Sequence, residues 1–140
     1  MKNQSCIESE RQIALRIKLL ILDVDGVLTD GGIITGSTAE GMRLELKTFN
    51  SQDGLGLRLV KSCGIELAIV SGRVSLATKY RAKELGISEC HQDSSGIKLP
   101  IVEQILRKKD YGWDSVCMIG DDLVDLSVLQ KSALPVAVAN

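Results

Sequence analysis

The chain has 140 residues, the usual size of one folded domain with its own hydrophobic core. Its 17 basic and 18 acidic residues nearly cancel, which argues against a nucleic-acid-binding or membrane-binding surface that works through net charge. No apolar stretch approaches the length that crosses a bilayer, and residues 1–16 are too polar for a secretion signal, so we expect a cytoplasmic protein.

The cysteines and the histidine argue against two kinds of site. Cys6, Cys63, Cys90 and Cys117 are widely spaced and form no Cys-x-x-Cys pair, so we expect reduced thiols that behave as small, mostly buried apolar side chains. His91 is the one histidine, which argues against a histidine metal cage or a Ser-His-Asp triad.

The first predicted element is a buried strand, the apolar run Ile17–Leu22, which leads directly into two aspartates. Asp23 and Asp25 stand at i and i+2 of an extended segment, so their side chains point the same way. Two carboxylates so close repel each other unless a cation or a shared proton compensates, and Mg²⁺ prefers oxygen ligands. The pattern therefore predicts a magnesium site; the alternative is an exposed acidic junction between a strand and a turn.

The next predicted element is a β-hairpin within Gly31–Phe49. The segment Arg43–Lys47 alternates polar and apolar residues, as a half-exposed strand does. The insertion is too short for a cap domain, so we expect an open site in one monomer. An apolar hairpin face needs burial, either by self-association or by folding back onto its own domain.

Helix and strand patterns alternate along the rest of the chain. Helices are predicted at Asp53–Ser62, Ser75–Leu85, Leu99–Lys108 and Leu123–Lys131. Strands are predicted at Glu66–Val70, Ser115–Ile119 and Pro135–Ala139. The expected buried helix positions are Leu55, Leu59, Val60, Leu76, Tyr80, Leu99, Val102, Ile105, Leu106, Val124, Val128 and Leu129. The alternation predicts an α/β fold, a Rossmann-like three-layer sandwich whose central parallel sheet has its ligand site at the carboxyl ends of the strands.

Three polar segments follow these strands or open these helices. The segment Ser71–Arg73 offers a hydroxyl and backbone amides for a phosphate oxygen, although its serine could simply cap a helix. Lys98 stands in the first turn of a helix, where it opposes the helix dipole; the alternative is a solvent-facing lysine. Asp121, Asp122 and Asp125 open the last helix, and helix capping explains one aspartate better than three.

The four segments, in this order, resemble the four motifs of the haloacid-dehalogenase-like (HAD) phosphohydrolases. The resemblance implies that Asp23 is the nucleophile and Asp25 the acid/base, that Ser71 holds the phosphoryl group and that Lys98 neutralises it. The chemistry is consistent, because a carboxylate is ionised at neutral pH and can form an aspartyl-phosphate without a base to activate it.

The resemblance also implies a Mg²⁺ cofactor. Its ligands would be Asp23, the backbone carbonyl of Asp25, and Asp121. Asp122 and Asp125 would not bind the metal directly but would orient these ligands or the metal-bound waters.

Further segments resemble the capless branch of this family, which includes 3-deoxy-D-manno-octulosonate 8-phosphate phosphatase. They are Asp23–Gly31, Lys47–Asn50, Asp53–Gly56 and Val136–Ala139. The positions that match substrate contacts of that branch are Asn50, Asp53, Gly54, Arg58, Gly72, Arg73, Arg81 and Lys98. Without the resemblance, Arg58 and Arg81 would be ordinary helix-surface residues. The chain departs from the branch at Ser51-Gln52, where Val-Arg is usual, and relatives continue beyond the position of Asn140 with a glycine-rich tail.

The resemblance thus implies a Mg²⁺-dependent phosphomonoesterase of lipopolysaccharide sugar synthesis that acts on 3-deoxy-D-manno-octulosonate 8-phosphate. A phosphatase for acylneuraminate 9-phosphate would use the same motifs. A non-catalytic regulatory or binding module is the alternative of another class, and the intact Asp23, Asp25, Lys98 and Asp121 argue against it. The implied partners are the sugar-acid phosphate and further copies of the chain, in a homotetramer built through the hairpin, with no nucleic acid and no membrane.

Overall fold

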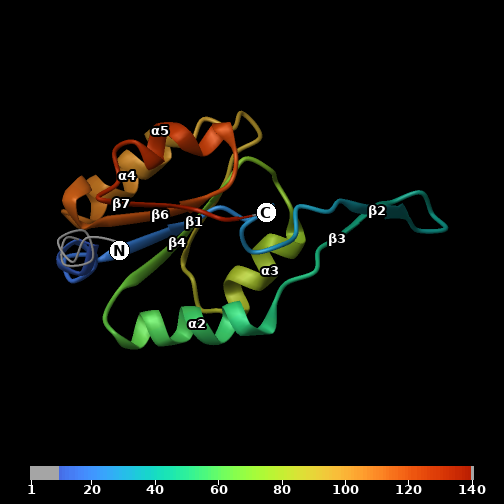
Figure 1. Ribbon diagram of the computed structural model, residues 1–140. Coiled ribbons are helices and arrows are strands. Elements are labelled where there is room, and N and C mark those ends of the chain that lie inside the picture. Colours follow the sequence, from blue (N-terminus) through green and yellow to red (C-terminus); the bar gives the residue numbers. More distant parts are fainter. Residues whose placement is uncertain (1–9, 140) are drawn as a thin grey trace.

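A parallel five-stranded sheet forms the centre of the protein in the computed structural model, which describes residues 10–139 (Figure 1). The strand order is β5-β4-β1-β6-β7. The strands are β1 (Leu19–Leu22), β4 (Glu66–Ser71), β5 (Glu89–Gln92), β6 (Val116–Gly120) and β7 (Leu134–Ala137). β1 lies in the middle, where Leu22 pairs with Ile69 of β4 and with Ile119 of β6. The carboxyl ends of these three strands therefore meet at one edge, where parallel sheets bind ligands.

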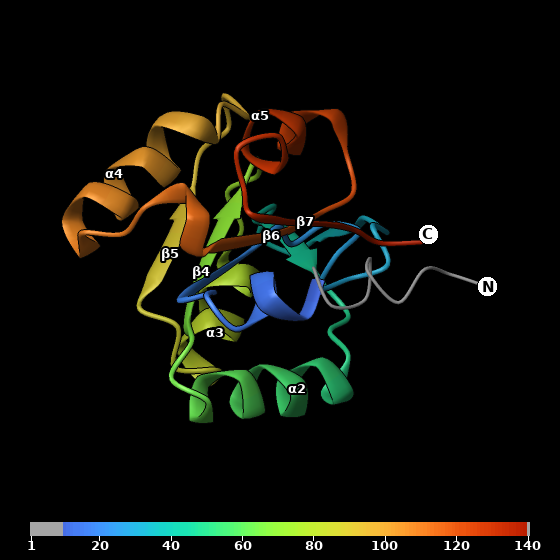
Figure 2. The same cartoon turned by 60° about the vertical axis from the view of Figure 1, so that its left-hand side comes forward.

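Helices cover both faces of this sheet (Figures 1 and 2). Their bounds are Ser51–Ser62 for α2, Leu76–Glu84 for α3, Leu99–Lys109 for α4 and Leu126–Leu129 for α5. Leu20 and Leu22 of β1 belong to the core cluster on the α2 and α3 side, whereas Leu19 and Ile21 belong to the cluster on the α4 and α5 side. This is the alternation that a strand buried on both faces requires. The predicted three-layer α/β sandwich is confirmed.

The predicted hairpin is also confirmed. β2 (Ile34–Ser37) pairs antiparallel with β3 (Arg43–Leu46). The hairpin projects from the sheet and carries no cap domain (Figure 1). Its apolar side chains Ile33, Ile34, Leu44 and Leu46 are exposed. The alternative in which the hairpin buries its apolar face on its own domain is therefore wrong.

β5 is a strand that the sequence analysis missed. Its four residues are Glu-Cys-His-Gln, without the apolar run of a central strand. The strand lies at the sheet edge, where polar side chains can find partners. Glu89 accepts a hydrogen bond from Lys108 (2.6 Å) and pairs with His91 (2.9 Å).

Most of the buried positions predicted for two helices were wrong, although Val60 of α2 is half-buried against the core. Leu55 and Leu59 of α2 are exposed, as are Leu76 and Tyr80 of α3. The buried residues are instead Gly54 and Leu57 in α2 and Thr78 and Ala82 in α3. Gly54 faces side chains of the α3 region: a Cβ on Gly54 would stand 2.9 Å from Nη2 of Arg81 and 3.5 Å from Cδ2 of Leu85.

The last two predicted elements differ in extent. In place of one helix over Leu123–Lys131, a 3₁₀ turn at Leu123–Asp125 precedes the short α5. The reason is a capping box between Asp122 and Asp125, which leaves Val124 exposed. β7 is shifted toward the amino terminus relative to the predicted Pro135–Ala139.

The remaining expectations concern thiols and the membrane. Among the described cysteines, all free, Cys117 is buried, Cys90 is half-buried and Cys63 is exposed, so the expectation of mostly buried thiols holds only in part. Cys6 and the first part of the segment considered for a secretion signal lie outside the described residues. Within residues 10–139, no helix has both the length and the apolar character needed to cross a bilayer.

Candidate active site

The four predicted motifs meet in one pocket at the carboxyl edge of the sheet. β1 leads into Asp23, β4 ends at Ser71, β6 leads into Asp121, and Lys98 stands at the start of α4. The pocket has a volume of about 340 Å³. Its lining residues are Asp23, Asp25, Ser71, Gly72, Arg73, Ser94, Ser95, Gly96, Lys98, Asp121, Asp122 and Val124.

Lys98 is buried at the bottom of this pocket. Only 2% of the residue is exposed, so the solvent-facing alternative is wrong. Its Nζ lies 2.7 Å from Oδ1 of Asp23 and 2.5 Å from Oδ1 of Asp125. A buried ammonium at the positive end of a helix is unfavourable by itself, and these two carboxylates stabilise it.

Asp125 fixes the loop that carries the last motif. The residue is fully buried, and its Oδ2 accepts hydrogen bonds from the backbone N–H groups of Asp121 (3.1 Å) and Asp122 (3.3 Å). Its other oxygen contacts Lys98. Asp125 thus holds both the loop and the lysine in place. Its support of metal ligands stays a prediction.

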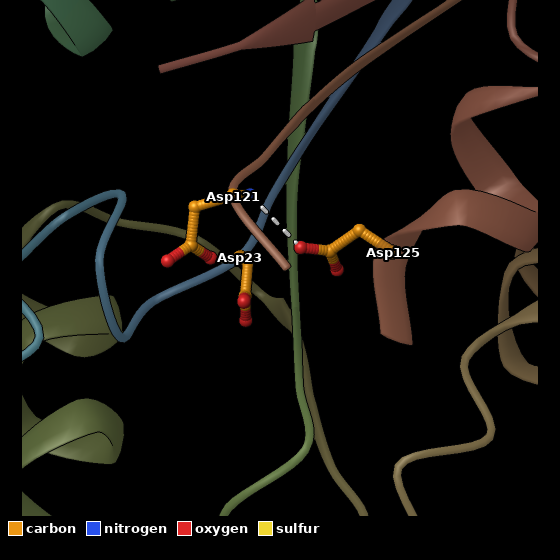
Figure 3. A group of neighbouring side chains, drawn as sticks. All are labelled: Asp23, Asp121 and Asp125. Carbon is orange, nitrogen blue, oxygen red and sulfur yellow. Dashed lines mark hydrogen bonds between the residues drawn. The ribbon is translucent and has the colours of Figure 1, made fainter. Parts of the chain in front are cut away.

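Asp23, Asp121 and Asp125 form a candidate metal site (Figure 3). Each offers a carboxylate oxygen, and these three oxygens lie within 4.8 Å of one another. Burial raises the pKa of Asp23, although the Lys98 ammonium opposes the effect. Burial and the neighbouring Asp125 and Asp122 raise the pKa of Asp121.

This donor set fits a hard divalent cation. One buried ammonium faces three carboxylates, and a second cation would favour their ionised forms. Because the oxygens of Asp125 are occupied by Lys98 and two amides, Asp23 and Asp121 are the better ligands. The backbone carbonyl of Asp25 stays a predicted ligand.

Gly26 lies directly against Asp121, a role that the sequence analysis missed. Its φ is 86°, in the left-handed region that favours glycine. A Cβ at this position would stand 1.9 Å from Oδ2 of Asp121. Only a glycine therefore leaves room for the Asp121 carboxylate in its present position.

We expect Gly26→Ala to weaken Mg²⁺ binding by about 10- to 100-fold, the usual effect of disturbing the support of a metal ligand. Isothermal titration with Mg²⁺ measures this. Gly64→Ala is the matched control, because Gly64 has a φ of 83° and a Cβ added there would meet no atom within 4 Å. It carries the same backbone strain without touching a ligand, so equal losses in both variants would contradict the steric explanation.

Asp25 contacts two cations that the sequence did not identify as its partners: Lys47, which directly follows β3, and Arg73, in the loop after β4. Its carboxylate forms ion pairs with Lys47 and, more loosely, with Arg73 (3.5 Å from Nε to Oδ2). Glu45 contacts both of these cations. The alternation of Arg43–Lys47 was the available signal, because it places Glu45 and Lys47 on one strand face, opposite Leu44 and Leu46.

Ser71 lies where a phosphate-binding hydroxyl is expected. It is 2% exposed and its Oγ accepts a hydrogen bond from the backbone N–H of Arg73 (3.2 Å). The capping alternative is wrong, because α3 begins at Leu76 and its N-cap is Ser75.

The structure divides the expected substrate-binding residues into three groups. Gly72 and Arg73 line the pocket with the catalytic candidates. A second group lies around the start of α2. Asn50 caps this helix, and Asn50 and Asp53 line a second pocket of about 400 Å³. Arg81 lies against Gly54 and donates a hydrogen bond to the carbonyl oxygen of Asn50. Arg58 is exposed on α2 and lines neither of these pockets.

Known proteins resemble this chain in sequence and in structure, although no family model matches it. The 3-deoxy-D-manno-octulosonate 8-phosphate phosphatase KdsC of Escherichia coli (strain K12) is 43% identical over 127 residues, which cover 91% of this chain and 65% of the relative. The chain thus spans about two thirds of the length of this curated relative.

Three solved structures match closely. The 3-deoxy-D-manno-octulosonate 8-phosphate phosphatase from Moraxella catarrhalis, in complex with magnesium ion, phosphate ion and KDO molecule, is 41% identical, with a TM-score of 0.84 over 95% of this chain and 73% of that one. The cobalt-bound phosphatase (YrbI) from Haemophilus influenzae is 32% identical, with a TM-score of 0.81 over 92% of this chain and 72% of that one. A structure described as a HAD superfamily hydrolase from Legionella pneumophila is 35% identical, with a TM-score of 0.86 over 96% of this chain and 71% of that one. With this similarity, the chain belongs to the 3-deoxy-D-manno-octulosonate 8-phosphate phosphatase family of the HAD superfamily.

Proposed function

We propose that the protein is a Mg²⁺-dependent phosphomonoesterase that converts 3-deoxy-D-manno-octulosonate 8-phosphate to the free sugar acid and phosphate through an aspartyl-phosphate on Asp23. One observation carries the proposal: Asp23 lies in a pocket between a buried lysine 2.7 Å away and a second aspartate suited to a metal ion. The Moraxella catarrhalis relative, with magnesium, phosphate and a KDO molecule, supports the choice of metal and substrate.

The proposed reaction has two steps, and Asp25 transfers one proton in each. In the first, Asp23 attacks phosphorus and Asp25 donates a proton to the departing sugar oxygen. In the second, water attacks the phosphorus of the aspartyl-phosphate while Asp25 takes its proton, and the bond from phosphorus to Asp23 breaks, which releases phosphate and restores the Asp23 carboxylate. Lys98 offsets negative charge on Asp23 and on the phosphoryl oxygens, and Ser71 with the amides of its loop holds those oxygens.

A magnesium ion would be held by Asp23 and Asp121. When bound, it supplies positive charge to the phosphoryl group and orients it toward the nucleophile. The raised pKa values of both carboxyls favour this assignment, since a cation between them restores the ionised form that the nucleophile needs.

The identity of the sugar is tested by a substrate panel. Ser51 and Gln52 replace the usual Val-Arg beside Asn50, so a different sugar acid, such as an acylneuraminate 9-phosphate, is the rival substrate. We expect 3-deoxy-D-manno-octulosonate 8-phosphate to give the highest kcat/KM with Mg²⁺, ahead of N-acetylneuraminate 9-phosphate and glucose 6-phosphate. A preference for N-acetylneuraminate 9-phosphate would show that this compound is the substrate. Hydrolysis of none of the three compounds would favour a binding module.

We also propose a homotetramer assembled through the hairpin. Leu44 and Leu46 are exposed there and need burial, and the site is open in one protomer. Leu44→Glu together with Leu46→Glu is expected to lower the mass measured by light scattering and to weaken substrate binding. The matched control is Leu55→Glu with Leu59→Glu on α2, two leucines that are similarly exposed. A monomeric, fully active unmodified protein would contradict this assembly.

The cytoplasmic location and the place in lipopolysaccharide sugar synthesis remain predictions from the resemblance. Cell fractionation and the sugar content of a deletion strain would test them.

A further inference from the structure

Four charged side chains form a closed ring between the hairpin and the active site. Lys47 pairs with Oδ1 of Asp25, and its Nζ also lies 3.7 Å from Oε1 of Glu45. Arg73 closes the ring, with Nη2 3.0 Å from Oε2 of Glu45 and Nε 3.5 Å from Oδ2 of Asp25. Cations and carboxylates alternate around this ring, so each charge has two neighbours of opposite sign.

Lys47 is the most buried member of the ring. Its side chain is 4% exposed, compared with 18% for Glu45, 22% for Asp25 and 40% for Arg73. Removing a lysine from water is costly and is compensated only by close carboxylates. The nearby Ser75 hydroxyl, with Lys47 and Arg73, holds the pKa of Glu45 below its usual range. Glu45 is therefore a persistent anion that keeps both cations in place.

We propose that Lys47 is a positioning residue for the acid/base Asp25 and that Glu45 holds Lys47 for this task; this inference rests on the proposed phosphatase function. Lys47 occupies Oδ1 of Asp25, which leaves Oδ2, with its looser contact to Arg73, as the oxygen that exchanges a proton with the leaving alcohol. A carboxyl group that must meet one particular oxygen of the substrate gains from such a fixed orientation.

A purely structural role for the ring, as an anchor of the hairpin, makes a different prediction. Loss of an anchor would lower the activity toward every substrate by a similar factor. Loss of the orientation of Asp25 would instead lower the activity by a factor that depends on the leaving group, because an alkoxide needs a proton to depart and a 4-nitrophenolate does not. The ratio kcat/KM covers the steps up to departure of the leaving group, so it includes the proton donation and excludes hydrolysis of the aspartyl-phosphate.

The test is Lys47→Met, assayed with the preferred sugar phosphate and with 4-nitrophenyl phosphate. We expect kcat/KM to fall about 10- to 100-fold with the sugar phosphate and by less than about threefold with the aryl phosphate. In an Asp25→Asn background, Lys47→Met should cause little further loss with the sugar phosphate, because the residue acts through Asp25. Lys131→Met is the control, since it breaks an exposed ion pair to Glu103 away from the pocket.

Glu45→Gln provides a second variant if Lys47→Met does not fold, and it should show the same dependence on the leaving group to a smaller degree. Equal losses with both substrates, or additive losses in the Asp25→Asn background, would overturn the positioning role while the phosphatase function stands. An unmodified protein that hydrolyses neither substrate with Mg²⁺ would instead overturn the proposed function, and the inference with it.

Discussion

Asp23→Asn is expected to lower phosphate release by about 10⁴-fold or more, the scale of losing a catalytic nucleophile. An amide cannot attack phosphorus and cannot bind the metal as a carboxylate does. Asp23 is 5% exposed, but Lys98 keeps its second partner Asp125, so the fold should survive. Thermal unfolding without Mg²⁺ should show a melting temperature close to that of the unmodified protein.

The control for this substitution is Asp110→Asn. Asp110 is exposed at the end of α4 with a φ of 54°, a conformation that asparagine tolerates equally well. Its activity should match that of the unmodified protein. Comparable turnover in Asp23→Asn would refute covalent catalysis, whereas an unfolded Asp23→Asn would show that the charge is needed for the fold.

Removal of Mg²⁺ with EDTA is expected to stop the reaction, and added Mg²⁺ should restore it. Without the ion, the three clustered carboxylates and an incoming phosphate face mainly Lys98, so repulsion opposes both binding and attack. Asp121→Ala should reproduce the chelated state, with activity at least about 100-fold lower at any Mg²⁺ concentration. Calcium should support the reaction poorly, because it prefers more ligands at longer distances than Mg²⁺ does.

Asp114→Ala is the matched control, since Asp114 is exposed on the 3₁₀ turn before β6 and belongs to no part of the pocket. Its activity and its Mg²⁺ requirement should be unchanged. Undiminished turnover after exhaustive chelation would contradict the assignment of the metal. A normal Mg²⁺ requirement in Asp121→Ala would move the metal to other ligands.

The core of the candidate site could be predicted because its parts are local to strand ends. Asp23, Ser71 and Asp121 follow predicted strands, and parallel strands bring their carboxyl ends to one edge whatever the details of packing. Lys98 was recognisable as an unfavourable charge at a helix start. Local chemistry and a simple topological rule were sufficient for these residues.

The missed features depend on contacts between segments far apart in the chain. Periodicity shows that α2 and α3 have apolar stripes, but it does not show which stripe the protein's own sheet covers, so Leu59 and Tyr80 were assigned to the wrong side. β5 has no apolar run and is a strand because it pairs with β4. The alternation in Arg43–Lys47 places Glu45 and Lys47 on one strand face, but the contact between Lys47 and Asp25 depends on how the hairpin lies against the loop after β1, which no local pattern specifies.

The most direct test of covalent catalysis is to detect phosphate on Asp23. In Asp25→Asn, 4-nitrophenyl phosphate should still phosphorylate the enzyme, because its leaving group needs no acid, while hydrolysis of the intermediate slows for want of a base. After acid quenching, mass spectrometry should find one added phosphoryl group on the peptide that contains Asp23. Release of 4-nitrophenol with no phosphorylated peptide, or with the group on another residue, would contradict the mechanism.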